Sequence, residues 1–261
     1  MQEMIKELIH YRHLLFMLTL KDIKIRYKQS IMGFFWAILM PIIIVAAGIM
    51  VKKAFSMLSG KPLDITDIAS VSVKALPWAF FIGSIRFATN SLTSNSNLVT
   101  KIYFPREIFP LASVFANLFD FAVASAVLAV ILSFSRIGFS INLLWVPALL
   151  ILLIFLTSAI GMLLACANLF FRDVKYIVEV LLTFGIFFTP VFYESNMLGD
   201  WAFVLLLNPV ANILEAFNNV IVLHRQPDFS WLAYTACFTL LGVPIAWKIF
   251  KKAENSFAEN I

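Results

Sequence analysis

The sequence predicts an all-α integral membrane protein with six transmembrane helices, an amphipathic N-terminal helix and a re-entrant helical segment between helices five and six. Hydrophobic residues make up 61% of the 261 residues and charged residues only 13%, whereas a soluble domain carries about 25% charged residues. Apolar runs long enough to cross a hydrocarbon core recur along the chain. Cations flank several of these runs, which is typical of cytoplasmic loops.

The net charge of +5 indicates orientation in a membrane and attraction to anionic lipid headgroups rather than nucleic-acid binding, because the cations lie beside apolar runs. Cys166 and Cys237 both lie inside apolar segments, where a free thiol packs as a small hydrophobic group. We therefore expect membrane lipids as partners, and no nucleic acid, disulfide framework or metal site.

The first 30 residues are expected to form a cytoplasmic segment at the membrane interface. Apolar residues recur at near-helical spacing over residues 4–18, with Lys6, Glu7 and two histidines mostly between them. This pattern is typical of an amphipathic helix that lies in the interfacial plane. Residues 22–28 alternate polar and apolar, as a strand does. A lone strand at a membrane surface would leave its backbone groups unpaired, so we predict a helix there as well.

Seven apolar stretches follow, and the charges at the two ends of the chain decide how many of them cross. Three lysines within 248–252 follow the last stretch, and the positive-inside rule assigns them, like the basic N-terminal segment, to the cytoplasm. An even number of stretches must therefore cross. Segment 201–223 contains Asn208, Pro209 and Glu215, whose polar groups lipid would leave unpaired, so we predict that it dips in and returns. The stretches are 31–51, 75–92, 108–134, 143–167, 176–192, 201–223 and 231–247.

This topology divides the chain into the segment 1–30, a six-helix transmembrane domain over 31–250 with its re-entrant outer part at about 193–223, and a cytoplasmic tail over 251–261. Lys and Arg gather in the parts that it assigns to the cytoplasm. The first outer loop, 52–74, is the exception because it carries four lysines. That loop is long enough to form a small structure outside the membrane.

Ionisable residues also fall within or near the apolar stretches. A charge at the bilayer centre is costly, so each marks either a functional site or a contact between helices. The functional alternative is a proton or ion relay. The structural alternative is a position near a helix end or pairing between helices, and Arg86 could pair with Asp120 if the second and third helices pack together. The residues are Arg86, Asp120, Glu179 and Glu215.

The sequence contains no phosphate-binding loop of the form Gly-x-x-x-x-Gly-Lys-Ser/Thr. Residues 60–62, Gly-Lys-Pro, come nearest and lack the hydroxyl residue. Neither a Gly-x-Ser-x-Gly nucleophile motif nor a His-Glu-x-x-His metal motif occurs. We therefore expect a transport subunit rather than an enzyme, and an ATP-driven mechanism would need its ATPase on another chain.

Blocks of residues along nearly the whole chain resemble, in order, the permease subunits of bacterial polysaccharide ABC exporters. Those subunits export O-antigen, capsule or teichoic acid chains. The blocks are Arg26-Tyr27-Lys28-x-Ser30-x-x-Gly33-x-x-Trp36-x-x-x-x-Pro41, Pro77-Trp78, Asn97-Leu98-Val99-x-Lys101-x-Tyr103-Phe104-Pro105-Arg106-Glu107 with Pro110-Leu111-Ala112, Asn168-x-Phe170-Phe171-Arg172-Asp173-Val174, Thr189-Pro190-Val191 and Asn208-Pro209.

The resemblance implies a function as well as a fold. It implies the channel-forming subunit of an ATP-driven exporter that moves a lipid-linked polysaccharide, with O-antigen as the first candidate, across the bacterial inner membrane. By analogy with the family, two copies of this chain would form a homodimer with two copies of a separate ABC ATPase. The ATPase would bind ATP and magnesium, and this chain would hold no cofactor. A drug or lipid ABC exporter is the nearest alternative, and a proton-coupled secondary carrier is a more distant one.

Residues 103–107 form a short cytoplasmic connection that contains two aromatic residues. These either anchor the loop at headgroup depth or form a knob that docks into a partner protein. The resemblance implies the second, a coupling element that fits into a cleft of the ATPase. Arg172-Asp173 in the other inner loop could be a local ion pair or a second contact with the ATPase. The predicted coupling residues are Lys101, Tyr103, Phe104, Pro105, Arg106, Glu107, Arg172 and Asp173.

The start of the first membrane helix is expected to meet the phosphate groups of a lipid-linked substrate through Arg26, Tyr27, Lys28 and Ser30. Ser30, Gly33 and Trp36 share one side of a helix because three or four residues separate them. The glycine and the tryptophan could also serve close helix packing and headgroup anchoring. In the family, helices one and five line the path, and aromatic faces there would stack on sugars. The predicted path residues are therefore Gly33, Trp36, Phe187, Phe188, Phe192 and Tyr193.

Overall fold

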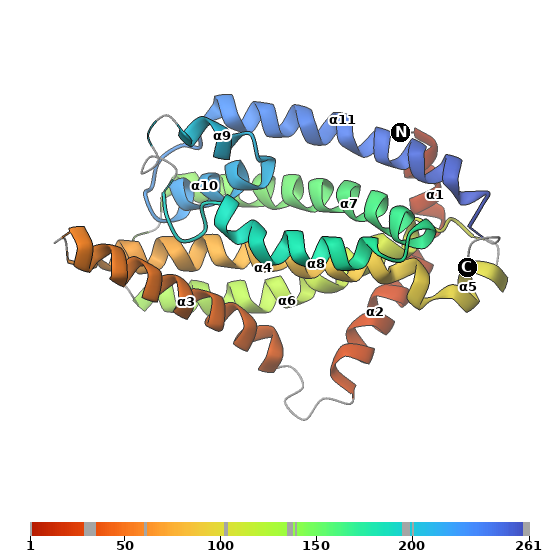
Figure 1. Ribbon diagram of the computed structural model, residues 1–261, viewed down its shortest axis with the longest axis horizontal. Helices are drawn as coiled ribbons and strands as arrows, with labels where there is room; N and C mark the ends of the chain where they lie inside the picture. The colour runs from red at the N-terminus through yellow and green to blue at the C-terminus, as the bar shows by residue number, and fades with distance from the viewer. Residues whose placement is uncertain are drawn as a thin grey trace.

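The computed structural model describes residues 2–28, 35–59, 62–101, 104–134, 138, 140–194, 199 and 201–257, and within these ranges every regular element is a helix. Most of the helices run along one long axis (Figure 1). The all-α prediction is confirmed for this part of the chain. The helices are α1 Gln2–His10, α2 Arg12–Lys28, α3 Phe35–Ser59, α4 Ile65–Ser94, α5 Ser96–Lys101, α6 Ile108–Phe134, η1 Ile141–Trp145, α7 Val146–Phe170, α8 Val174–Gly185, η2 Ile186–Phe188, α9 Ala202–Leu206, α10 Pro209–Ile221 and α11 Phe229–Glu254.

Four helices among the described residues are long and apolar enough to cross a membrane: α4, α6, α7 together with η1, and α11. Each lies over a stretch that the sequence predicted to cross, and α6 has the predicted bounds, 108–134. The chain is therefore an integral membrane protein.

The N-terminal segment forms two helices rather than one. Tyr11 lies in a turn between α1 and α2, although helical hydrogen bonds continue across it. The helix predicted over residues 22–28 is confirmed as the end of α2. This helix packs along α6, where the Ser113 hydroxyl lies 3.4 Å from a carboxylate oxygen of Asp22. The helical structure predicted over residues 4–18 is present but divided at Tyr11 between α1 and α2, and its position in the interfacial plane stays a prediction.

The α3–α4 connection is shorter than the predicted loop over residues 52–74. α3 continues to Ser59, and α4 begins at Ile65 rather than near residue 75. A side-chain oxygen of Asp64 accepts a hydrogen bond from the Ile65 N–H at 2.7 Å, and Asp67 accepts one from the Asp64 N–H at 3.2 Å. This capping box fixes the start of α4. The prediction of a loop over residues 52–74 was wrong, since most of that range forms two helix ends.

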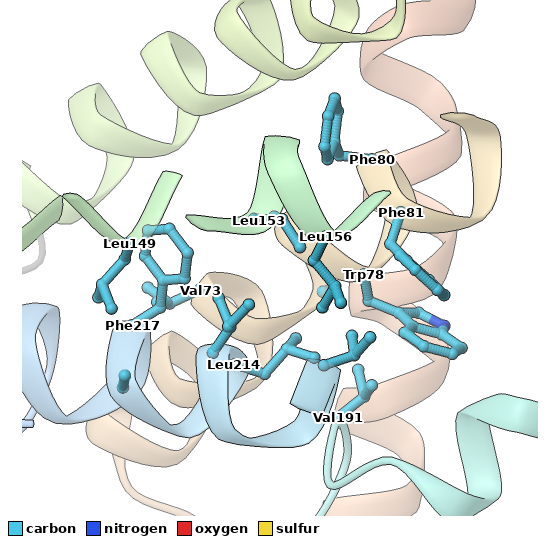
Figure 2. Packing of buried hydrophobic residues seen from close by; sticks show 14 of the residues in the cluster. Val73, Trp78, Phe80, Phe81, Leu149, Leu153, Leu156, Val191, Leu214 and Phe217 are labelled. Carbon is cyan, nitrogen blue, oxygen red and sulfur yellow. The ribbon is translucent and has the colours of Figure 1, made fainter. Parts of the chain in front are cut away.

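α4 is the centre of the bundle and contacts α3, α6, α7, α8 and α10. Its Trp78 and Phe81 rings stack with their centroids 5.7 Å apart. Leu153 of α7 and Leu214 of α10 are fully buried in the same cluster (Figure 2). Lipid tails are as apolar as these side chains, so close packing rather than exclusion from water holds such helices together.

Segment 201–223 contains two helices, α9 and α10, and its predicted re-entrant course stays a prediction. α10 begins at Pro209 after Asn208, whose side-chain oxygen accepts a hydrogen bond from the Val210 N–H at 3.0 Å. The helix packs between α4, α7 and α11. Within it, the Asn212 amide donates to the Leu206 carbonyl at 2.9 Å and to the Thr235 hydroxyl at 3.0 Å. Acceptors within the chain thus satisfy these N–H donors, which lipid tails could not do.

Gly161 lets α7 approach α4 closely, and we expect its replacement by Ala to destabilise the protein. A Cβ at this position would lie 2.9 Å from the Cβ of Ala88, which is completely buried. Such overpacking costs about 1–3 kcal/mol. Thermal unfolding of the detergent-extracted protein measures the effect.

The matched control is Gly242→Ala in α11, where an added Cβ meets nothing within 4 Å among the described residues. This substitution should stabilise the protein by up to about 1 kcal/mol through helix propensity. A Gly161→Ala variant as stable as the Gly242→Ala variant would contradict the close packing of α4 on α7.

Candidate functional site

A polar cluster joins the end of α2 to the middle of α6. A guanidinium nitrogen of Arg26, Nη1, lies 2.5 Å from Asp120 Oδ2 and 3.1 Å from Asn117 Oδ1. The Tyr27 hydroxyl donates to the other oxygen of Asp120. The guanidinium also lies over the Phe87 ring, 4.0 Å from its centroid. Two of the predicted substrate-contacting residues thus hold one carboxylate inside the protein.

The surroundings of this cluster fix its protonation. Burial, reinforced by the hydrogen bond to Asp120, raises the pKa of Tyr27 well above its ordinary value. The phenol therefore stays protonated and donates. The side chains of Arg26 and Asp120 are 19% and 23% exposed, so the pair is only partly accessible to water. An anion that approaches Arg26 has to compete with a carboxylate already in place.

The predicted pairing of Arg86 with Asp120 was wrong. Arg86 donates instead to Glu179 of α8, from Nε at 2.6 Å and from Nη2 at 2.8 Å. α4 and α6 are in contact, but Arg86 lies on the side of α4 that meets α8. α4 and α6 do pack together, but the rotation of each helix about its own axis turns Arg86 away from Asp120.

The other predicted substrate-contacting residues are only partly described. Lys28 is exposed at the end of α2. Ser30 and Gly33 lie outside the described residues, so the proposed stripe on one side of the first helix stays a prediction. Trp36 is 43% exposed near the start of α3.

The predicted coupling loop is attached to the C-terminal part of the chain. Phe104 is buried, and its ring centroid lies 5.3 Å from that of Phe109. Arg106 donates two hydrogen bonds to Glu254. Its backbone N–H donates to Glu254 Oε1 at 3.1 Å, and its Nη1 donates to the Glu254 carbonyl at 2.7 Å. Pro105, which lies between Phe104 and Arg106 in the sequence, is half-buried. Tyr103 lies outside the described residues. The described side chains of this loop thus serve internal packing.

Glu107 is fully buried in the same loop. Lys251 of α11 lies 3.1 Å from Glu107 Oε1, and the indole N–H of Trp247 donates to the same oxygen at 3.3 Å. Lys251 also pairs with Glu7 of α1 at 3.0 Å and with Glu254 at 3.3 Å. Burial raises the pKa of Glu107 above its ordinary value, and the neighbouring ammonium partly offsets this. One lysine therefore links both ends of the chain to the loop.

Three of the predicted coupling residues are instead exposed at that end of the molecule. Lys101 ends α5, and Arg172 and Asp173 form the turn between α7 and α8. The preceding Phe171 is 69% exposed. Both connections lie at the end of the bundle where the chain begins and ends (Figure 1). These positions, unlike Phe104 and Glu107, have exposed side chains.

The predicted path residues also include both exposed and buried side chains. Phe187 and Phe188 in η2 are 64% and 70% exposed. Tyr193 is half-buried, and its hydroxyl donates to the Phe187 carbonyl at 2.8 Å. Phe192 is only 8% exposed and packs so closely on α3 that a Cβ on Gly48 would lie 2.7 Å from its ring. We therefore leave Phe192 out of the candidate path.

A second set of polar contacts lies at the opposite end of the bundle and accounts for two of the four lysines of the segment 52–74. Lys52, which is 7% exposed, pairs with Asp67 at 2.6 Å. Lys74 is fully buried, and its ammonium donates to the Tyr193 carbonyl at 2.6 Å. Two lysines that seemed to contradict the positive-inside rule therefore have partners inside the fold.

Sequence reasoning missed the partners that make these clusters. Ser113, Asn117 and Asp120 recur at helical spacing on α6 and face α2. This stripe was a readable signal that α6 has a polar side. No local signal could identify Trp247 as a partner of Glu107, since 140 residues separate them.

The helical spans and the charges paired between the helices define a polytopic membrane protein. Residues 13–222 match the family described as ABC-2 type transporter, and the chain belongs to this family. It is 27% identical over 264 residues to the O-antigen export system permease protein RfbA of Myxococcus xanthus, with 100% of each chain covered. Two such permeases of Klebsiella pneumoniae are 29% and 25% identical, each with 94% of both chains covered.

Proposed function

We propose that this chain is the channel-forming subunit of an ATP-driven exporter that moves a lipid-linked polysaccharide, and specifically O-antigen, across the bacterial inner membrane. The observation that carries this proposal is the similarity to O-antigen export permeases over 94% or more of both chains. Membership of the ABC-2 type transporter family supports transport driven by a separate ABC ATPase, which would bind the ATP and magnesium. No cofactor on this chain is part of the proposal.

The proposed topology has six crossings and cytoplasmic termini. The pairing of Glu7 in α1 with Lys251 in α11 supports an even number of crossings, because it brings the two ends of the chain to one side. α3, with 25 residues, is about 38 Å long and could supply a fifth crossing. α8 and η2 would supply the sixth, and α9 with α10 would form the re-entrant segment. The divisions 1–30, 31–250 and 251–261 remain part of the proposal.

The proposed assembly is a homodimer with two ATPase copies and the path between the two permease subunits. Closed two-fold symmetry is the commonest arrangement of homo-oligomers and would put the path on the axis. The exposed aromatic residues Phe187 and Phe188 support a path wall that includes η2. Native mass measurement of the detergent-extracted complex tests the stoichiometry, and a stable, active monomer without ATPase would contradict it.

Within this assembly, Lys101 and Arg172 would contact the ATPase, with Asp173 beside them. Reversing both cations, Lys101→Glu with Arg172→Glu, is expected to weaken association with the ATPase by at least about tenfold, or about 1.4 kcal/mol, because charge complementarity at the interface is lost. Co-purification of the ATPase with the tagged permease measures this.

The control variant is Lys252→Glu, which reverses an exposed cation at the same end of the molecule. It should retain the ATPase. If the double reversal also retains the ATPase, the coupling surface lies elsewhere, and Tyr103 becomes the next residue to replace.

The function itself is tested with the permease and its ATPase reconstituted together in lipid vesicles. ATP-dependent movement of a lipid-linked O-antigen chain to the opposite leaflet is the expected result. Movement of lipids or small apolar compounds without any movement of the glycan would replace the proposal with a lipid or drug exporter.

A further inference from the structure

The ion pair between Arg86 of α4, a candidate membrane span, and Glu179 of α8 is exposed. Two hydrogen bonds of 2.6 and 2.8 Å join the side chains. Each side chain is nevertheless 44% exposed. Arg86 lies about 12 Å from the end of α4 at Ser94, and α4 is about 45 Å long against a hydrocarbon core of about 30 Å, so Arg86 lies just inside the hydrocarbon region if α4 spans the membrane symmetrically.

Lipid tails cannot cover such a pair at low cost. A charged side chain inside the hydrocarbon region is costly, and pairing recovers only part of the desolvation penalty. Intramembrane charges accordingly face protein or a water-filled cavity. The exposed side of the Arg86–Glu179 pair therefore faces something other than lipid.

Polar side chains continue from the pair along both helices. Asn90 and Thr93 follow Arg86 on α4, and Thr183 follows Glu179 on α8, all at spacings that keep residues on one side of a helix. Thr93 and Thr183 are exposed, and Asn90 is half-buried.

Each of these side chains donates a hydrogen bond to a backbone carbonyl of its own helix. The Asn90 amide donates to the Arg86 carbonyl at 3.0 Å, and the Thr183 hydroxyl donates to the Glu179 carbonyl at 2.7 Å. The Thr93 hydroxyl donates to the Asn90 carbonyl at 3.0 Å. With these donors engaged, the side-chain oxygens can accept hydrogen bonds from an incoming group.

We propose that Arg86, Glu179, Asn90, Thr93 and Thr183 form a hydroxyl-binding site on the wall of the translocation path, in its cytoplasmic half, and that sugar units of the passing polysaccharide occupy it. This inference rests on the proposed export of a polysaccharide. Sugar hydroxyls donate to the carboxylate and the side-chain oxygens and accept from the guanidinium. Tyr176 of α8 and Phe187 of η2 are 63% and 64% exposed and add aromatic faces for stacking.

The charge balance of the site favours a neutral sugar over an anion. Arg86 already donates two hydrogen bonds to Glu179, so the pair carries no net charge. A phosphate would meet the carboxylate as well as the guanidinium. Hydroxyl groups bind such a surface through several weak contacts, and a polymer that must move on requires binding that is easily broken.

The test places single cysteines at Asn90 and Thr183 in a chain that lacks Cys166 and Cys237, assembled with its ATPase in vesicles. A membrane-impermeant thiol reagent is expected to label both positions. Labelling should become several-fold slower while a lipid-linked O-antigen chain is held in the complex. Val130→Cys in α6 and Leu240→Cys in α11 are the controls, because both native side chains are apolar and more than half exposed, and they should stay unlabelled.

A second measurement separates sugar contact from a purely structural role. Glu179→Gln should raise the glycan concentration that half-maximally stimulates ATP hydrolysis, measured in complexes matched for their content of permease and ATPase. Leu181→Ala on the same helix is the control, since this side chain is 65% exposed and apolar, and it should leave the half-maximal concentration and the unstimulated hydrolysis unchanged.

The outcomes distinguish this inference from the proposed function. A cysteine-free complex that exports no glycan contradicts the proposed function. An active complex whose Asn90→Cys and Thr183→Cys variants resist labelling with or without glycan overturns the inference, because a second copy or lipid then covers this side. Labelling that glycan does not slow, with an unchanged half-maximal concentration in Glu179→Gln, shows a wet wall that sugar does not contact and also overturns it.

Discussion

Replacing Asp120 with Asn should lower the free energy of unfolding by about 3–5 kcal/mol, the range found when one partner of a buried ion pair is removed. The substitution keeps the size of the side chain but leaves the Arg26 guanidinium partly buried beside Asn117 and Phe87. It also weakens the acceptor of the Tyr27 hydroxyl. Because the pair is about one-fifth exposed, the lower end of the range is expected. Thermal unfolding of the detergent-extracted protein provides the measurement.

Lys24→Gln is the matched control for this prediction, since it removes an exposed cation from the same helix. Its effect should stay within about 0.5 kcal/mol. Combining Arg26→Gln with Asp120→Asn should cost less than the two single changes added together, because neither partner is then left unpaired. Additive costs would mean that the two charges do not interact.

Lys251→Ala is expected to have a similarly large effect, again about 3–5 kcal/mol, because it leaves the fully buried Glu107 without its cation. Glu7 and Glu254 lose the same partner. The adjacent Lys252→Ala is the control, since this side chain is exposed, and it should change stability by less than about 0.5 kcal/mol. Equal stability of the two variants would rule out a structural role for the cluster.

The pH dependence of the Lys251→Ala variant gives an independent check. Burial raises the pKa of Glu107, so its carboxyl stays protonated to a higher pH in the folded protein than in the unfolded chain, where its pKa is about 4.3. Stability is therefore lost as the pH rises from the pKa of the unfolded chain through the raised pKa of the folded protein. Without the ammonium this loss should grow, and the deficit of the variant should shrink toward acidic pH. A deficit that does not change with pH would show that Glu107 is not the group left unpaired.

Much of the fold could be predicted because membrane insertion constrains the sequence so strongly. The length of the apolar run predicted α6 with its bounds, and the cost of unpaired backbone groups predicted a helix over residues 22–28. The early start of α4 was readable in Asp64 and Asp67, whose spacing is that of a capping box, but hydrophobicity alone placed the boundary too late.

The candidate site was less predictable, because it depends on how each helix is rotated. Arg86 faces α8 and Asp120 faces α2, so the predicted pair does not form although α4 and α6 touch. The motif that contains Phe104 and Glu107 indicated a specialised loop. Its contacts with α11 were not predictable, since they join segments far apart in the chain.

The cluster around Lys251 has a consequence for how the protein is made. Glu7 is synthesised before Glu107, whereas Lys251 and Glu254 are synthesised after it. Glu107 therefore waits for its cation until α11 has been made and has docked. A copy that stops before α11 keeps an uncompensated carboxylate and an unattached loop. An ATPase that binds this end of the molecule would meet the assembled surface only on copies that carry α11, so assembly itself would select against truncated ones.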